Sequence, residues 1–266
     1  MFAFDILPPF FQACFDAWAA MGGGSSSAGD LAVGSGAGSG PLLVASLSSK
    51  SCYQLLLELN PPRPHCVEKF FPCFGPWDWS CTWKSLHFMP LDKSVIDLNW
   101  KVAHGVLYTA ERLVSFGLQL QLSCFCGAHS ENLVHLFYSC PLAQSGISWV
   151  QSLLFLFSPV CPSLTVRHLL FGFSNSELRA TPKVFSYLLN VCKYFVWLQR
   201  NDHRFRSGQP SAIQLIAAIK ARTTFYLPLL AKRFLTNRRR RLFLRQWAAN
   251  GLFGCFKDST FVVSFP

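Results

Sequence analysis

Residues 124–141 read CFCGAHSENLVHLFYSCP, and three thiols and the His135 imidazole fall within seventeen residues of this stretch. One, eight and four residues separate Cys124, Cys126, His135 and Cys140. Structural zinc sites take four sulfur or nitrogen ligands in a tetrahedron, and closely spaced cysteines and histidines in a short segment can supply them. The spacing predicts a zinc knuckle, with His129 as an alternative to His135 for the nitrogen ligand.

Geometry restricts how the last two ligands reach one metal. His135 and Cys140 are five positions apart, so on an ideal α-helix they point about 140° apart. The helix must therefore break between them, and Ser139 and Pro141 are suitable breakers. A competing interpretation has the three thiols simply buried as small apolar residues, since the chain holds 11 cysteines and is 51% apolar. The one-residue first gap is also shorter than the two to four residues typical of zinc sites.

Composition restricts the class of protein. The 266 residues suffice for one or two domains, and only 14% are charged while 15% are aromatic, which is typical of large buried faces. The number of cysteines is odd and residues 1–20 lack a basic start, so we expect a nuclear or cytoplasmic protein that is not secreted. Polar residues interrupt the apolar runs 147–157 and 184–198, so no membrane span is expected.

The charge is concentrated near the C-terminus. Residues 193–245 hold 13 Lys and Arg and one acid, a net charge of +12, whereas the remainder carries −1. This asymmetry indicates a polyanionic partner, RNA or single-stranded DNA, bound by charges that meet phosphates and rings that meet bases. The alternatives are a solvated face and a nuclear-import run. The candidate nucleic-acid-binding residues are Lys232, Arg233, Arg238, Arg239, Arg240, Arg241, Arg245, Phe234 and Trp247.

Apolar residues recur at helical spacing along most of the chain, which predicts a mainly α fold: helical, bundle-like segments around the zinc knuckle. A Gly/Ser-rich linker is expected to be flexible. Only residues 261–264 are candidates for extended structure. The expected regions are an amphipathic helix at 1–21, the linker at 22–47, the knuckle region at 48–150, a basic helical region at 151–250 and a tail at 251–266.

Three strings carry a resemblance to a known family: DLNWKVAHGVL at 97–107, TAERL at 109–113, and the Cys/His segment itself. Together they resemble the C-terminal zinc-binding region of reverse transcriptases from non-LTR (LINE-type) retrotransposons. The resemblance implies Zn²⁺ as cofactor and Cys124, Cys126, His135 and Cys140 as its ligands. The family's polymerases hold two metals with an adjacent aspartate pair, which this sequence lacks, so no catalytic residue and no enzyme activity are expected.

The sequence therefore predicts a zinc-knuckle fragment that binds nucleic acid without polymerase activity. An intact polymerase from a related element is a second expected partner, and a membrane is not. The alternative is a retroelement remnant or protein-interaction module that binds no nucleic acid. Two further interpretations concern single residues: His104 is expected to pack or hydrogen-bond rather than catalyse, and a second metal site would draw on His65, Cys66, Cys73 and Cys81.

Overall fold

The structure is a computed structural model that describes residues 32–33, 42–43, 65–88, 90–161 and 163–266. The chain divides into two units, Met1–Arg63 and Pro64–Pro266. In the first unit, Ala32–Val33 (β1) pairs antiparallel with Leu42–Leu43 (β2). The helix expected at 1–21 and most of the Gly/Ser-rich linker lie outside the described residues.

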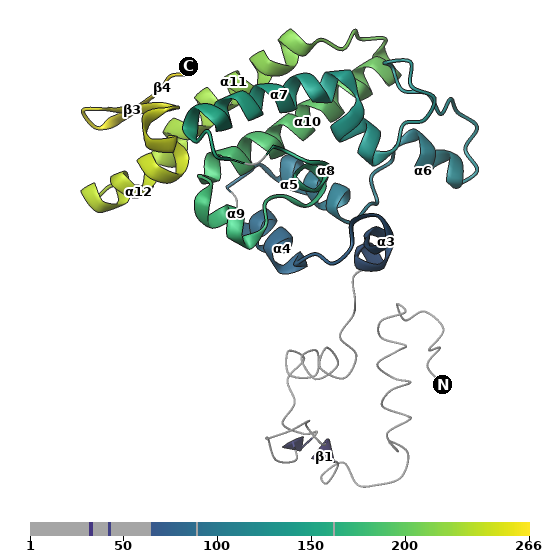
Figure 1. The fold of residues 1–266 in the computed structure, drawn as a ribbon, viewed down its shortest axis with the longest axis horizontal. Coiled ribbons are helices and arrows are strands. Elements are labelled where there is room, and N and C mark those ends of the chain that lie inside the picture. The colour runs from purple at the N-terminus through teal and green to yellow at the C-terminus, as the bar shows by residue number, and fades with distance from the viewer. Residues whose placement is uncertain (1–31, 34–41, 44–64, 89, 162) are drawn as a thin grey trace, which may run out of the picture. The chain divides into compact units, whose positions relative to one another are not determined.

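The second unit is mainly helical, as the periodicity predicts (Figure 1). Its α-helices are α3 (His65–Phe74), α4 (Trp79–Phe88), α5 (Lys93–Ala103), α6 (Ala110–Ser115), α7 (Pro141–Phe157), α8 (Val166–Phe171), α9 (Asn175–Ala180), α10 (Lys183–Arg206), α11 (Ala212–Ala231) and α12 (Asn237–Trp247). A π-helical turn, His135–Ser139, precedes α7, and a 3₁₀ turn, Ala249–Gly251, follows α12.

Helix α10 is the centre of this unit. It contacts α5, α7, α8, α11 and α12, and Figure 1 shows α7, α10 and α11 running side by side. Gly146 of α7 allows a close approach, because a Cβ there would lie 2.5 Å from Cys192 Sγ of α10. One apolar core extends from α3 to the C-terminal hairpin, so the boundary expected at residue 150 falls inside α7 within a single unit.

Local signals explain where several helices begin and end. The Thr109 hydroxyl accepts from the Arg112 N–H at the start of α6, and Thr236 caps α12 by accepting from the Arg239 N–H. Helix α5 stops at His104 because Gly105 adopts φ +64°, which favours glycine. Helix α3 tolerates the prolines of its segment because Pro61, Pro62 and Pro64 precede its first residue and Pro72 occurs only in its last turn.

The C-terminal tail forms a hairpin, Gly254–Lys257 (β3) and Thr260–Val263 (β4), with Lys257 opposite Thr260. Strand β4 matches the extended segment expected there, whereas β3 was not expected. The rings of Phe256 and Phe261 both pack against Phe243 of α12, with centroids 5.7 and 4.9 Å away. These contacts attach the hairpin to α12, which explains why so short a segment forms strands.

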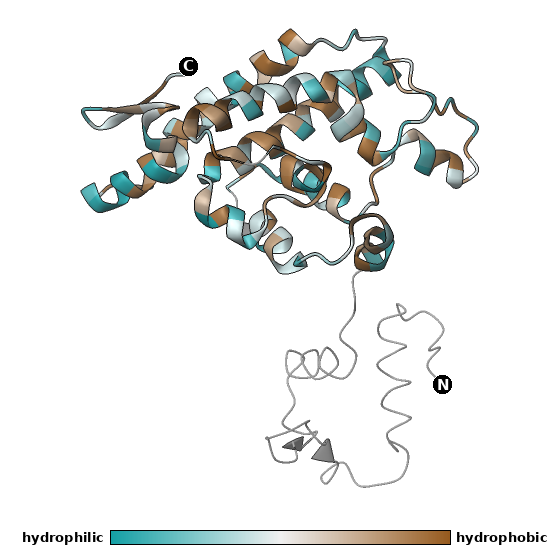
Figure 2. Ribbon diagram, viewed as in Figure 1, coloured by the Kyte–Doolittle hydropathy of each residue, from teal (hydrophilic) through white to brown (hydrophobic). Residues whose placement is uncertain are grey.

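Aromatic residues before the knuckle pack together, and His104 packs among them, as expected. Trp79 stacks on Trp83, and His104 lies against both Trp83 and Trp100, with centroids 4.7 and 4.1 Å away. Burial lowers the pKa of His104, which suits a packed neutral ring. Figure 2 shows apolar residues along α7 and α10 and a hydrophilic far end on α12. No helix of the described residues is long and apolar enough to cross a bilayer.

Candidate metal centre and basic surface

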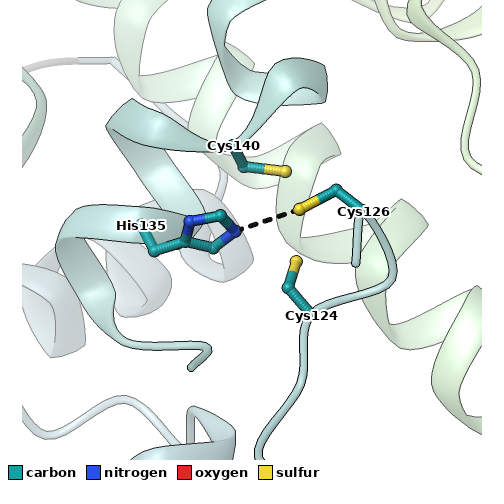
Figure 3. A group of neighbouring side chains, drawn as sticks. All are labelled: Cys124, Cys126, His135 and Cys140. Carbon is teal, nitrogen blue, oxygen red and sulfur yellow. Dashed lines mark hydrogen bonds between the residues drawn. The ribbon is translucent and has the colours of Figure 1, made fainter. Parts of the chain in front are cut away.

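Four side chains converge beside the start of α7. The ligand atoms of Cys124, Cys126, His135 and Cys140 all lie within 4.8 Å of one another, and Figure 3 shows them facing a common centre. Zinc bonds of about 2.0 to 2.3 Å place tetrahedral ligand atoms about 3.5 to 3.8 Å apart. The distance from Cys126 Sγ to His135 Nε2 is 3.3 Å. The group therefore fits a tetrahedral zinc ion with small adjustments, and Nε2 is the imidazole atom that faces it.

The one-residue gap works because the chain turns directly after Cys124, with Phe125 and Cys126 as the two central residues of a β-turn. The Gly127 N–H donates to the Cys124 carbonyl at 3.0 Å, and the Cys124 N–H donates to Ala128 at 2.9 Å. Gly127 has φ +88°, a conformation that glycine adopts without strain. This tight turn places both thiols on one side of the knuckle.

The other two ligands are brought together by the π-helical turn. The Cys140 N–H donates to the His135 carbonyl at 2.7 Å, an i to i+5 bond that widens the turn. Cys140 then has φ −65° and ψ 134°, so the helix breaks there, as expected, before Pro141 starts α7. The Asn132 side chain accepts from the His135 N–H at 2.8 Å and caps the turn. This widening of the turn was not expected. It explains how His135 and Cys140 can reach one metal, although residues five apart point about 140° apart on an ideal α-helix.

The electrostatics favour metal ligation. The pKa of Cys140 lies below its usual value, first because the Cys124 thiol donates toward it and also because the N–H groups of Leu142 and Ala143 lie at the start of α7. The pKa of Cys124 is raised by that same contact and by burial. Burial lowers the pKa of His135 despite nearby Glu131, which keeps the imidazole neutral. Zinc needs thiolate and neutral imidazole ligands, and this site already favours one of each.

A buried ion pair joins the knuckle to α10. Arg200 and Glu131 are each only 2% exposed at their side chains, and Arg200 Nε lies 3.1 and 3.0 Å from the two Glu131 oxygens. Glu131 also accepts from the Ala110 N–H of α6 at 3.0 Å, and Arg200 lies over the Trp197 ring. The pair was not predicted. Its partners are 69 residues apart, and an acid in a short polar segment gives no indication of its partner.

The structure does not assemble the alternative metal sites. Among the described residues, the group at 124–140 is the only set of three or more ligating side chains that could hold a metal. His129 is exposed and outside this group, so it is not the nitrogen ligand in this conformation. The second site considered for His65, Cys66, Cys73 and Cys81 does not form.

The predicted nucleic-acid-binding residues separate into an exposed set and a packed set. Lys232, Arg233, Arg238, Arg239, Arg241 and Arg245 are exposed, while the Arg240 guanidinium lies over the Phe256 ring at 5.3 Å. Phe234 is half-buried against Phe243. Trp247 is 5% exposed and packs edge-on against Tyr187, so its expected role of stacking on a base is wrong for this structure. Trp247 lies on the buried face of α12 together with Phe243, so it is a core residue.

Packing also keeps part of the positive charge that was counted from the sequence away from the exposed surface. Lys193 and Arg200 are 3% and 2% exposed. Arg222 forms an ion pair with Asp92, and Lys220 lies over the Trp149 and Phe265 rings. The basic surface is therefore concentrated on and just before α12. Figure 1 shows α12 at the opposite end of the unit from α6, which is hydrogen-bonded to the knuckle through Glu131.

Comparison with known proteins agrees with the metal centre. No curated protein and no solved structure matches the chain. A family model described as zinc-binding in reverse transcriptase matches residues 47–146, a segment that contains all four ligands and part of α7. Residues 47–146 are therefore similar to a zinc-binding region of reverse transcriptases, and by this similarity and the geometry of the four ligands the cofactor of the site is zinc.

Proposed function

We propose that this protein is a zinc-stabilised module that binds single-stranded nucleic acid, derived from the reverse transcriptase of a non-LTR (LINE-type) element and acting without polymerase activity. The observation that carries the proposal is the exposed arginine surface of α12. Arg238, Arg239, Arg241 and Arg245 are exposed, and none forms an ion pair with an acid that the structure describes.

The helix geometry supports a polyanionic ligand. Four consecutive arginines cover about 300° of a helical wheel, so a helix packed along one face cannot turn all of them to one side. Here α12 is peripheral and buries Phe243 and Trp247, which leaves arginines on both flanks of the buried face. A flexible strand that follows the helix can meet charges on both flanks, because its phosphates are not held on a rigid duplex.

Zinc has a structural role in this proposal. Four protein ligands would complete a tetrahedral zinc site and would leave no open position for a substrate or water. The knuckle also lies away from α12, and Glu131 and Arg200 connect it to the central helix. We therefore expect Cys140→Ser to weaken nucleic-acid binding less than loss of the arginines does, provided that the variant remains folded.

The salt dependence of binding tests the proposal. If about five of the exposed basic residues contact phosphates of a single strand, log K should fall with log salt with a slope of about −3.5, since each contact contributes about −0.7. Changing Arg238, Arg239 and Arg241 together to Gln should reduce the slope by about 2. Arg222→Gln is the matched control, because Asp92 already neutralises that guanidinium.

Each outcome of this experiment supports a different conclusion. A flatter slope and weaker binding in the triple variant, with the control unchanged, supports nucleic-acid binding through α12. Unchanged affinity and slope in the triple variant would refute that surface as the binding site. If the wild-type protein binds neither RNA nor single-stranded DNA, the alternative of a protein-interaction module, including one that works with an intact polymerase, is favoured.

A further inference from the structure

Two cations from distant parts of the chain converge on one backbone carbonyl near the knuckle. Lys69 Nζ of α3 donates to the Gly105 carbonyl oxygen at 2.7 Å, and Arg112 Nη1 of α6 donates to the same atom at 3.0 Å. Neither cation forms an ion pair with a described carboxylate, although exposed Glu111 lies nearby. Burial and then the Arg112 charge lower the pKa of Lys69, as expected for two cations held close together.

Both cations keep unused hydrogen-bond donors. An ammonium has three donors and a guanidinium has five, yet in the described structure each side chain donates only to Gly105. The Nε of Arg112 is buried and has no acceptor among the described residues. The two side chains border a hollow of about 420 Å³ that Thr109, Asn132 and the one acid, Glu111, also line. The Arg112 guanidinium lies 5.1 Å from the centre of the Phe116 ring, which is 58% exposed.

Gly105 is what allows the cations to meet. Its φ is +64°, and a Cβ at this position would lie 2.9 Å from Lys69 Nζ and 3.0 Å from the Phe70 ring. A side chain here would push the ammonium away from the carbonyl, in addition to straining the backbone. The carbonyl itself carries only a partial negative charge, so it cannot balance two full positive charges. A ligand that carries a full negative charge would offset the charge of the two cations.

We propose that this hollow binds a phosphate group of a single nucleic-acid strand through Lys69 and Arg112, with the exposed Phe116 ring beside it for a base. A phosphate offers several strong acceptors to a guanidinium and an ammonium, and its charge offsets their repulsion. The proposal rests on the nucleic-acid binding proposed above and adds a second contact. Helices α6 and α12 lie at opposite ends of the unit, so this contact is separate from the α12 surface.

Binding of an oligothymidylate by the full-length zinc-loaded protein tests this site. Lys69→Met and Arg112→Gln should each weaken binding and reduce the salt slope by about 0.7. Lys101→Met is the matched control, since Asp97 already pairs with that ammonium at 2.7 Å. Gly105→Ala keeps every charge but displaces Lys69, so weaker binding by this variant would show that the geometry matters rather than net charge. Circular dichroism of each variant confirms that it is folded.

A second probe, inorganic phosphate, separates the sources of the anion. Phosphate should shift the NMR signals of the Lys69 side chain and compete with the oligonucleotide. If phosphate shifts those signals but Lys69→Met leaves oligonucleotide binding unchanged, the hollow takes free phosphate and the proposed strand contact is wrong. If Lys69→Met and Arg112→Gln behave like the control while the α12 variants lose binding, this site is refuted and the proposed function stands. If the wild-type protein binds no oligonucleotide, both proposals fall.

Discussion

Removing one member of the Glu131–Arg200 pair should destabilise the protein strongly. Both side chains are 2% exposed, and Glu131 holds Arg200 while it also accepts from the Ala110 N–H. In Glu131→Gln the guanidinium stays buried without a countercharge. The amide oxygen of the Glu131→Gln variant can still accept from it, and its contacts with the Asn201 side chain at 2.8 Å, the Trp197 ring and the Tyr108 carbonyl remain, but none of these groups carries a negative charge.

The expected magnitude follows from the burial. Breaking a buried ion pair by changing one partner costs about 3–5 kcal/mol, because an uncompensated charge remains. A domain of this size has a free energy of unfolding of about 5–15 kcal/mol, so the loss is a large share of the total. The double variant Glu131→Gln with Arg200→Met leaves no charge behind and should lie within about 2 kcal/mol of wild type.

Denaturant unfolding of the zinc-loaded protein measures these differences through a double-mutant cycle, in which coupling of at least about 2 kcal/mol is expected. Asp97→Asn is the control, because the Lys101–Asp97 pair is 38% and 59% exposed and should contribute under about 1 kcal/mol. Additive effects below about 1 kcal/mol for Glu131→Gln and Arg200→Met would refute a buried, paired geometry. The single variants should also lose zinc to a chelator faster than wild type, since α10 no longer holds the knuckle.

Two further measurements concern the metal site and a buried amine. The full-length protein should hold one zinc per chain. It should lose helical signal when a strong chelator removes the zinc, since structural zinc contributes on the order of 10 kcal/mol to folding. His135→Ala should weaken zinc binding more than His129→Ala, and the reverse order would assign the ligand to His129. Lys193 is 3% exposed, and burial lowers its pKa from 10.5 to about 7. Between these values the unfolded state binds more protons, so the Lys193 contribution to stability rises with pH across that window. Lys193→Met should therefore stabilise the protein most at pH 7 and below, by as much as about 4 kcal/mol, and the gain should vanish above pH 10.5. A gain that does not change with pH would show that burial does not lower the pKa of Lys193.

The zinc ligands could be predicted from the sequence because all four lie within one short segment. Their residue types and spacing indicate tetrahedral coordination without any knowledge of the rest of the fold. The helices α7 and α10 were also predictable, since long periodic segments with clear ends depend on local signals. Helix α3 is harder to predict from the sequence, because prolines precede it and Pro72 lies in its last turn, although proline is tolerated next to a helix start.

Local sequence determined that this chain is mainly helical, that it carries a Cys-Cys-His-Cys group, and that its positive charge is concentrated near the C-terminus. Only the tertiary structure decided which charges reach solvent. It buried Lys193 and Arg200, paired Arg222 with Asp92, and placed Trp247 in the core. It also brought Lys69 and Arg112 to one carbonyl and Glu131 to Arg200. The reason is that each of these contacts joins residues far apart in the chain, so their proximity depends on how the helices pack.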